Sequence, residues 1–580
     1  MFSAFRWWDL RKGFSELKEG KDFYNKYIEA QTRQIADWLV GINISRLYTC
    51  LMQQNGLNET FSIGRVQTPT LFLVYQKEKS IADFKPQNFY EVEGIFITAD
   101  GEGYRGKLNQ KFDSPTDLKT FLNENGVLKS KDAQGVVVKY ETNRKETSSP
   151  KLYSFSNLQE DMNKRYKVSP AQTLEIVQSL YESKLLSYPR TDCNYITESE
   201  LHYLQNNLSD YLNTFNLTIK SPNMNPGKRY VNGEKVQEHY AIIPTKKTLS
   251  ETEFNKLNDN EKQVYELVLK RTLAMFEEKY QYDETEILTK VGQVHFKTIG
   301  KTVINSGFKK ILNDEEGTKD EEVVLLPQLK LEQQVRAELK GKEGVTKPPK
   351  SFTEGTLITG MKNVGRIIDD VTNKDILKET EGIGTEATRA NILETLKRQS
   401  YITVVKNKVK LTEKGAALCE IIKNREISSA EMTAKWESYL KKIGDGEGSQ
   451  EKFLLSIERF IKYLLSEAPN DVKNGAILIN KIKEDKEQNE NVGNCPKCGK
   501  IVKEKSKVFA CTNTECEFIL FKKILNKTLS ASDVRLLLSD KRQTNLIKGL
   551  VGKSGKTFDA YITFDDSYST TFQFPKRGEK

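Results

Sequence analysis

Four cysteines near the end of the chain have the residue type and spacing of a metal site. Cys495 and Cys498 are followed, after twelve residues, by Cys511 and Cys516, which gives the pattern C-x2-C-x12-C-x4-C. Four thiolates complete the tetrahedral shell of a structural zinc ion and leave no open position for catalysis. A redox-active CxxC or four unrelated thiols are the alternatives, and the second cysteine pair at this spacing favours zinc.

A tyrosine within the segment LLSYPRTD could act as a nucleophile. A phenol attacks poorly at its usual pKa of about 10. Tyr188 could nevertheless form a phosphodiester if cations and hydrogen bonds stabilised the phenoxide and the phosphate. Arg190 could hold that phosphate with two parallel hydrogen bonds, and Asp192 could orient it. A tyrosine before a proline is far more often a packing residue, so this pattern alone does not establish the chemistry.

Two glycine-rich segments look like nucleotide-binding loops but lack residues that such loops need. The run GKSGKT ends at Thr557, and a P-loop would require a glycine where Leu550 stands. We therefore predict a hairpin turn in this run, before a strand that follows Phe558. Gly382 and Gly384 have no apolar strand before them, which a dinucleotide-binding unit requires.

Composition sets the broad class. The 580 residues suggest about three to five domains. The 90 lysines and arginines exceed the 80 acidic residues, and this net charge of +10 favours a polyanion as partner. Three histidines argue against a multi-histidine metal centre, and seven cysteines argue against a disulfide framework. Without a membrane-length apolar run or a signal-peptide pattern, we expect no membrane partner and a cytoplasmic location.

Hydrophobic periodicity divides the chain into helical and strand-rich parts. The segment SPAQ predicts a helix that starts with a capping box at Ser169 and stops before Pro189. A helix over 387–399 followed by two strands around Lys406 and Asn407 predicts a winged helix. The acidic run 313–322 is predicted to be a hairpin tip. The expected domains are a helical base (1–80), a β-rich arch (81–150), a tyrosine-bearing winged-helix-like domain (151–282), the second half of the arch (283–346), a second helical base with the winged helix (347–470), a polar linker (471–494) and a C-terminal unit (495–580).

The segment around Tyr188 resembles the active-site segment of the type IA DNA topoisomerases, specifically their topoisomerase III branch. Further segments agree with that family in order: SIGRVQTPT (62–70), LY and NLQ (152–159), HYAIIPT (239–245), FTEGTL (352–357), GIGTEATRA (382–390) and TAKWE (433–437). The resemblance covers nearly the whole chain. It implies an α+β multidomain fold, a toroidal gate with winged-helix-like domains, a β-rich arch and a C-terminal zinc ribbon followed by a topoisomerase repeat.

The resemblance also implies roles for particular residues. Tyr188 would become attached to a 5′ DNA phosphate, Arg190 would hold the scissile phosphate, and His239 would contact or polarise nearby groups. Transient cleavage of one strand followed by strand passage would relax negative supercoils or decatenate DNA without ATP. Single-stranded DNA and DNA junctions would be the partners. The residues expected to grip the single strand are Ser62, Ile63, Gly64, Arg65, Val66 and Gln67, with Arg46 as a weaker candidate.

One part of the family pattern has no counterpart in this sequence. The family carries a Toprim domain whose glutamate and D-x-D-x-x-x-E-G segment bind Mg²⁺, and the resemblance here starts after that domain. No D-x-D occurs, and the pairs at Asp369 and Asp565 are predicted to be turns. We therefore expect the Mg²⁺ ligands to lie outside this chain, with a Toprim-bearing chain as a possible partner. The alternative is a DNA-binding remnant that is inactive or depends on such a partner.

Overall fold

The structure is a computed structural model that describes residues 14–15, 17, 19–127, 131–312, 326–364, 382–552 and 554–575. The chain divides into two compact units, residues 1–45 with 62–464, and residues 46–61 with 465–580. The predicted hairpin tip at 313–322 and the pair at Asp369 lie outside the described residues. No described helix combines the length and the apolar character that crossing a membrane requires.

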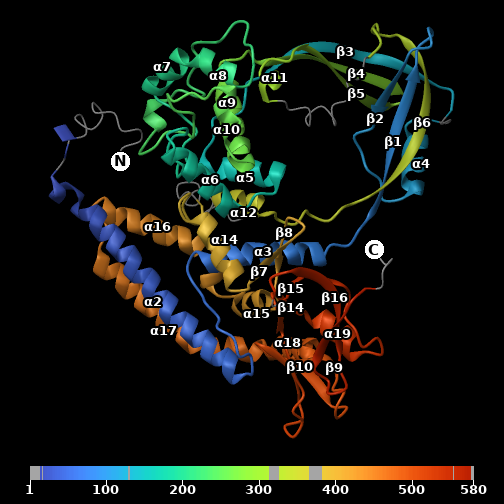
Figure 1. Cartoon of the computed structure of the whole chain (residues 1–580). Helices are drawn as coiled ribbons and strands as arrows, with labels where there is room; N and C mark the ends of the chain where they lie inside the picture. Colours follow the sequence, from blue (N-terminus) through green and yellow to red (C-terminus); the bar gives the residue numbers. More distant parts are fainter. Residues whose placement is uncertain are drawn as a thin grey trace. The chain divides into compact units, whose positions relative to one another are not determined.

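Six strands of the first unit form a closed barrel in the order β1-β2-β5-β4-β3-β6 (Figure 1). They are β1 (Asn88–Ile97), β2 (Gly103–Lys107), β3 (Ala133–Thr147), β4 (Tyr280–Val291), β5 (Val294–Asn305) and β6 (Gln334–Val345), with α4 (Pro115–Glu124) between β2 and β3 and α11 (Lys309–Leu312) after β5. All neighbouring pairs are antiparallel. Because each strand has two neighbours, the barrel presents no open sheet edge. Both ranges expected to form the arch therefore contribute strands to one barrel.

Aromatic side chains fill the barrel interior. Phe96, Tyr104 and Phe296 are almost fully buried, and the ring centroids of Phe96 and Phe296 lie 5.7 Å apart in an edge-on arrangement. Two glycines make room for these rings. A Cβ atom on Gly94 would lie 2.5 Å from the Phe96 ring, and one on Gly106 would lie 3.0 Å from it. Side chains at these two positions would therefore push the aromatic core apart.

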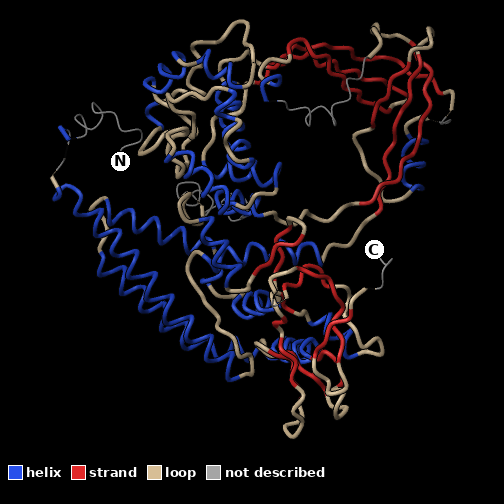
Figure 2. The backbone as a smooth tube through the Cα atoms, viewed as in Figure 1, coloured by secondary structure: helices blue, strands red, loops and turns tan. Residues whose placement is uncertain are grey.

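The tyrosine-bearing domain is inserted between β3 and β4, and Thr147 pairs with Tyr280 where the chain leaves and re-enters the barrel. In Figure 2 this domain consists mainly of blue helices and tan loops, in contrast to the red strands of the barrel. Its helices are α5 (Phe155–Tyr166), α6 (Pro170–Glu182), α7 (Glu198–Asn206), α8 (Leu208–Thr214), η2 (Gly233–Lys235), α9 (Glu251–Phe254) and α10 (Asp259–Leu273). The capping box predicted at Ser169 is confirmed. Helix α6 ends at Glu182, earlier than Pro189, because Lys184 adopts a left-handed conformation with φ 61°.

Helices also form over the two halves of the predicted helical base, and the two longest contain residues of both units. They are η1 (Gly20–Phe23), α2 (Tyr24–Gln54), α3 (Gln67–Ala82), α12 (Glu354–Lys362), α14 (Arg389–Arg398), α15 (Glu413–Ile422), η5 (Glu426–Ser428), α16 (Ala430–Gly444) and α17 (Gln450–Asn474). The predicted hairpin is confirmed as β7 (Ile402–Val405) and β8 (Lys408–Leu411). Lys406 and Asn407 form its turn with φ angles of 49° and 58°, as a two-residue turn between twisted strands requires.

The range 471–494, expected to be a polar linker, is mostly helical. Helix α17 continues to Asn474, and α18 (Ala476–Glu490) follows almost directly. Ile479 and Ile482 are buried one helical turn apart, which gives this polar segment the apolar contact that its sequence seemed to lack. Lysine, glutamate and glutamine also favour helix where packing does not decide the conformation.

The C-terminal part of the second unit is built mainly from short strands. A four-stranded sheet has the order β12-β11-β10-β9, and a three-stranded sheet has the order β15-β16-β17. The elements are β9 (Asn491–Asn494), β10 (Ile501–Glu504), β11 (Val508–Cys511), β12 (Ile519–Phe521), β13 (Lys523–Ile524), β14 (Lys527–Thr528), α19 (Ala531–Leu538), β15 (Ile547–Val551), β16 (Thr557–Phe564) and β17 (Thr570–Gln573). The predicted hairpin turn near Gly555 is confirmed, since Leu550 pairs with Phe558. Asp565 also lies in a turn and accepts hydrogen bonds from the N–H groups of Ser567 and Ser569.

Candidate active site and DNA-contact segment

Tyr188 lies in the loop after α6, where its ring is held between two other rings. The ring centroid of His239 is 4.3 Å away with the planes tilted by 37°, and Tyr181 approaches edge-on at 5.6 Å. The side chain is half-buried. These contacts restrict where the phenol can point and leave part of it accessible to a substrate.

The backbone around the tyrosine is fixed by the segment 239–243, which comes from another predicted motif. The N–H of Ser187 donates to the carbonyl of Ile243 at 2.9 Å, and its hydroxyl donates to the carbonyl of Ala241 at 3.0 Å. The hydroxyl of Thr191 donates to the carbonyl of His239 at 3.2 Å. Hydrogen bonds on both sides of Tyr188 thus position its backbone, as a reacting group requires.

Arg190 follows two residues after the tyrosine and is exposed. Among the described residues, its guanidinium has no ion-pair or hydrogen-bond partner, and the expected contact with Asp192 is not formed. An exposed guanidinium without a carboxylate partner can accept a phosphate in bidentate geometry. The structure therefore leaves Arg190 available to an anion.

His239 is electrostatically suited to remain neutral. Partial burial lowers the pKa of its imidazole below the usual value of about 6.5, although the nearby Glu238 carboxylate opposes the shift. A neutral imidazole has one donor and one acceptor nitrogen. At neutral pH, His239 can therefore donate a hydrogen bond to a phosphate oxygen or accept one from a hydroxyl group.

The predicted DNA-contact segment leads into α3 and is braced from within. The side-chain amide of Gln67 donates to the hydroxyl of Ser62 at 3.0 Å. The N–H of Gly64 donates to the hydroxyl of Thr68 at 3.0 Å, and Tyr401 donates to the carbonyl of Ser62 at 2.9 Å. Ile63 is buried, whereas Ser62, Gly64, Val66 and Gln67 are half-buried.

Arg65 is buried and compensated, with 4% of its surface exposed. Its Nε donates to Asp37 Oδ1 at 2.7 Å, and its Nη1 lies 2.8 Å from Glu437 Oε1. The ring of Trp436 lies 5.8 Å from the guanidinium carbon, and Thr433 donates to the Arg65 carbonyl. This arrangement differs from the contact with single-stranded DNA that the family resemblance implies for Arg65, because its guanidinium already faces two carboxylates.

Arg46, the weaker candidate for a DNA contact, is exposed on α2. Its guanidinium makes no ion pair with the described residues. It belongs to the second compact unit, whereas the segment 62–67 belongs to the first. Arg46 is therefore available to a phosphate, and its role stays a prediction.

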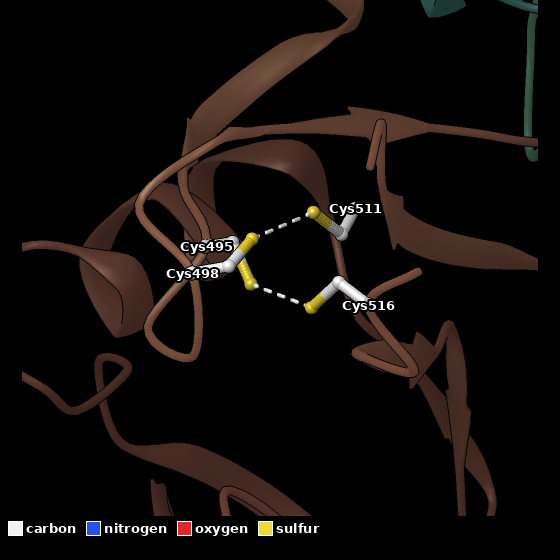
Figure 3. A group of neighbouring side chains, drawn as sticks. All are labelled: Cys495, Cys498, Cys511 and Cys516. Carbon is white, nitrogen blue, oxygen red and sulfur yellow. Dashed lines mark hydrogen bonds between the residues drawn. The ribbon is translucent and has the colours of Figure 1, made fainter. Parts of the chain in front are cut away.

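The four clustered cysteines converge as their spacing predicts (Figure 3). Their Sγ atoms all lie within 4.8 Å of one another, with 3.6 Å between Cys495 and Cys516 and 3.4 Å between Cys498 and Cys511. A hydrogen bond from the backbone of Lys500 lowers the pKa of Cys498 to about 7. A preformed set of four thiols at these distances has the donor chemistry of a structural zinc site.

Comparison with known proteins decides the family. Residues 21–455 match the family model described as DNA topoisomerase, and residues 515–575 match the model of a C-terminal repeat of topoisomerase. The chain belongs to the type IA DNA topoisomerases, on the topoisomerase III branch. A protein named DNA topoisomerase 3 from Bacillus cereus is 32% identical over 527 residues, which cover 87% of this chain and 69% of the relative. Its namesake from Bacillus subtilis is 31% identical over 534 residues, with the same coverage of both chains.

A solved structure supports the fold. Full-length topoisomerase I from Thermotoga maritima matches with a TM-score of 0.59 and 19% identity, covering 98% of this chain and 78% of that one. The predicted α+β multidomain class is confirmed by this match. The chain is therefore an isomerase that changes DNA topology, and the comparisons do not support the alternative of an inactive DNA-binding remnant.

Magnesium requires several oxygen ligands in near-octahedral geometry. Among the described residues of this topoisomerase, the only group of three or more potential ligands close enough to hold an ion is the four-cysteine cluster. Thiolates suit zinc and do not suit magnesium. The cluster therefore has ligands of the type that zinc prefers.

A buried ionic network between α5 and the motif GIGTEATRA was not predicted from the sequence. The carboxylate of Glu386 accepts from the N–H of Ser156 at 2.9 Å and also from its hydroxyl. Lys362 and Arg389 approach the same carboxylate at 2.9 and 3.0 Å. Ser156 lies in the first turn of α5, where the helix dipole favours an acidic group. The motif GIGTEATRA thus joins the second helical base to the tyrosine-bearing domain. In the sequence, its only recognisable signal is a charged pair among small residues, and this signal does not reveal the contact.

Proposed function

We propose that Tyr188 cleaves one DNA strand by transesterification. Its phenol oxygen forms a bond to a backbone phosphorus, the bond to the 3′ oxygen breaks, and the strand becomes attached through its 5′ phosphate. The phenol loses a proton and the 3′ oxygen gains one, so the exchange consumes no ATP and its reversal reseals the strand. This proposal rests mainly on the half-buried ring of Tyr188, which packs against His239. Arg190, two residues later, is exposed and has no acidic partner among the described residues.

Each neighbouring group has a role in this proposal. Arg190 would stabilise the charge that develops on the equatorial phosphate oxygens. Neutral His239 would donate a hydrogen bond to the phosphate or accept the phenol proton. Passage of a second strand before resealing would relax negative supercoils or separate linked circles, and single strands and junctions would be the substrates.

The test traps the covalent complex with end-labelled single-stranded DNA and maps the modified peptide. We expect the adduct on Tyr188, and we expect Tyr188→Phe to abolish it while leaving single-strand binding nearly intact. Tyr181→Phe is the matched control, because it removes a hydroxyl from the ring that packs against Tyr188. An adduct on Tyr195, whose pKa is lowered by a hydrogen bond from Lys151, would overturn the assignment.

We further propose that efficient cleavage depends on acidic residues and Mg²⁺ supplied by a Toprim-bearing chain. In this proposal, those groups would act beside the leaving 3′ oxygen. We expect weak relaxation of supercoiled DNA by the 580 residues alone. Relaxation should be at least about tenfold faster when such a chain and Mg²⁺ are added, since about 1.36 kcal/mol corresponds to tenfold in rate. Fast relaxation by this chain alone would contradict the dependence.

For the segment 62–67, we propose contact with single-stranded DNA through its half-buried members, with Arg65 fixing the backbone from within. Ser62 and Gln67 would meet the strand, and Arg46 would add a phosphate contact. Gln67→Ala should weaken binding about three- to tenfold, as loss of one hydrogen bond to a charged group does. The measurement is fluorescence anisotropy with labelled single strands, and unchanged affinity would argue against the contact.

We propose one structural zinc ion at Cys495, Cys498, Cys511 and Cys516. Metal analysis of the full chain purified without chelator should give about one zinc per chain. Cys498→Ser should lose the metal and destabilise the C-terminal sheets, because a small unit depends strongly on its metal. Cys50→Ser is the control, since Cys50 is exposed and lies outside the cluster. A metal-free wild-type chain would refute the proposal.

A further inference from the structure

Two lysines converge on one tyrosine near the proposed nucleophile. Lys151 Nζ lies 2.7 Å from the hydroxyl oxygen of Tyr195, and it is 4.7 Å from the ring centroid. Lys235 Nζ lies 5.2 Å from the same centroid. The first lysine precedes α5, the tyrosine follows the active-site loop, and the second lysine ends η2. Three separate parts of the domain thus bring two positive charges to one phenol.

These charges are not compensated within the described residues. Neither Lys151 nor Lys235 makes an ion pair there, although both are exposed. The nearby Arg271 differs, because it forms an ion pair with Asp161 at 2.8 Å. The hydrogen bond from Lys151, together with the charges of both lysines, lowers the pKa of the Tyr195 phenol. Such a cluster of cations and a hydroxyl group attracts an anion.

The cluster belongs to the same hydrogen-bonded framework as Tyr188. The carbonyl of Tyr195 accepts from the N–H of Ala241 at 2.9 Å, two residues after the histidine that packs against the nucleophile. The side chain of Asn194 donates to the carbonyl of Leu152 at 2.6 Å and fixes the neighbouring turn. A pocket of about 250 Å³ beside the cluster is lined by Lys151, Asn157, Glu160, Asp161, Asn194 and Arg271. The cluster and Tyr188 are therefore both held by backbone hydrogen bonds to the segment 239–243.

We propose that Lys151, Tyr195 and Lys235 bind a backbone phosphate of the single strand at a linkage other than the scissile one. This inference rests on the proposed function, because it assumes that the strand passes Tyr188. Two ammonium groups and a phenol hydroxyl can all donate to one phosphodiester. They carry no pattern that would select a base, so this subsite fixes the register of the strand and not its sequence.

The test scans a single-stranded oligonucleotide of defined cleavage site with one neutral methylphosphonate linkage at a time. With the wild-type chain, we expect one linkage outside the scissile position to lower affinity about tenfold, the size expected for charged hydrogen bonds. The double variant Lys151→Gln/Lys235→Gln should bind the unmodified strand about tenfold more weakly. A methylphosphonate at that linkage should no longer lower the affinity of the double variant, whereas the effects at all other linkages should be unchanged. Its salt dependence should fall by about 0.7 in slope for each phosphate that the variant no longer neutralises.

Controls separate this subsite from folding and from the chemistry. Lys220→Gln removes an exposed lysine of the same domain and should change neither affinity nor the scan. Tyr195→Phe keeps the ring but removes the hydroxyl group, so it should lose part of the response to the methylphosphonate. Thermal melting should show that each variant is folded. If the double variant behaves like Lys220→Gln, the subsite is refuted even if Tyr188 still forms its adduct. If the scan responds but the adduct maps elsewhere, the subsite stands and the proposed nucleophile is wrong.

Discussion

Two arginines that the sequence predicted to meet DNA phosphates lie in opposite environments. Arg65 is buried against Asp37 and Glu437, whereas Arg190 is exposed without a partner among the described residues. A guanidinium taken out of water must be neutralised by carboxylates, or burial would cost several kcal/mol. Once neutralised, it has little charge left for DNA. The comparison shows that an arginine in a family motif can either bind carboxylates of the protein itself or stay open to solvent.

Arg389 extends the comparison within the same unit. It is 1% exposed, pairs with Glu386 and donates to the carbonyls of Ile383 and Gly384. Like Arg65, it comes from a motif shared with the topoisomerases and acts on the protein itself. Of the three arginines, Arg190 alone has its guanidinium open to solvent.

The largest effect is expected from Arg190→Ala. Adduct formation at Tyr188 should fall about 10²- to 10³-fold, as for loss of a group that stabilises developing charge. The unfolding free energy should stay unchanged, because the Arg190 guanidinium bonds to none of the described residues. Arg190→Lys should recover only part of the rate, since an ammonium cannot reproduce the bidentate contact. Single-turnover cleavage assays measure the rate. Undiminished cleavage would show that Arg190 does not take part in the reaction.

Arg65→Ala should have the reverse profile. The substitution leaves Asp37 and Glu437 without their shared cation, and the unfolding free energy should drop by about 2–3 kcal/mol, less than for a fully buried pair because Asp37 is 41% exposed. Chemical denaturation measures this drop, with Arg190→Ala as the matched control. A stable Arg65→Ala chain with weakened DNA binding would show that the guanidinium contacts DNA after all.

A smaller effect concerns acid stability. Burial tends to raise the pKa of Glu437, but Arg65 and Arg33 outweigh it, so the folded-state pKa lies below the ordinary value of about 4.3. A depressed carboxyl pKa adds stability above the unfolded pKa, and this stability is lost as the pH falls through the folded value. Glu437→Gln should therefore flatten the decline of unfolding free energy below about pH 4.3. An unchanged pH profile would show that the pair does not depend on this charge.

The smallest expected change is in the titration of His239. Burial lowers its pKa, so NMR of the imidazole should give a midpoint below about 6.5 in the folded chain. Adding single-stranded DNA should raise that midpoint if His239 lies beside a phosphate, because a negative charge favours the protonated form. A midpoint above about 6.5 without DNA would contradict the environment that the structure gives this histidine.

Local signals in the sequence predicted much of the fold. The capping box at Ser169 and the turn at Lys406 and Asn407 depend on neighbouring residues alone, and both are present. The cysteine cluster also follows from spacing, because metal ligands tolerate little variation in distance. The polar range 471–494 is the exception, since only tertiary burial of Ile479 and Ile482 reveals its helical face.

Features that depend on distant partners were not predictable in this way. The burial of Arg65 requires Glu437, and the cluster at Tyr195 requires Lys151 and Lys235. Nothing near these residues in the sequence marks the contact. Family motifs located the segments, but they did not distinguish an arginine that faces a carboxylate from one that faces solvent. That distinction is set by the fold, which brings charges from separate segments together.

The insertion of the tyrosine-bearing domain between β3 and β4 also dictates an order of assembly during synthesis. Strand β1 needs β6, and Asn88 pairs with Val345, so the barrel cannot close until the ribosome has made both. By then the inserted helices have been complete for some time, and their core is drawn almost entirely from residues 152–276. They can fold first and shorten the chain that must be closed, since Thr147 and Tyr280 already lie side by side. Folding of the tyrosine-bearing domain thus also prepares the closure of the nascent barrel.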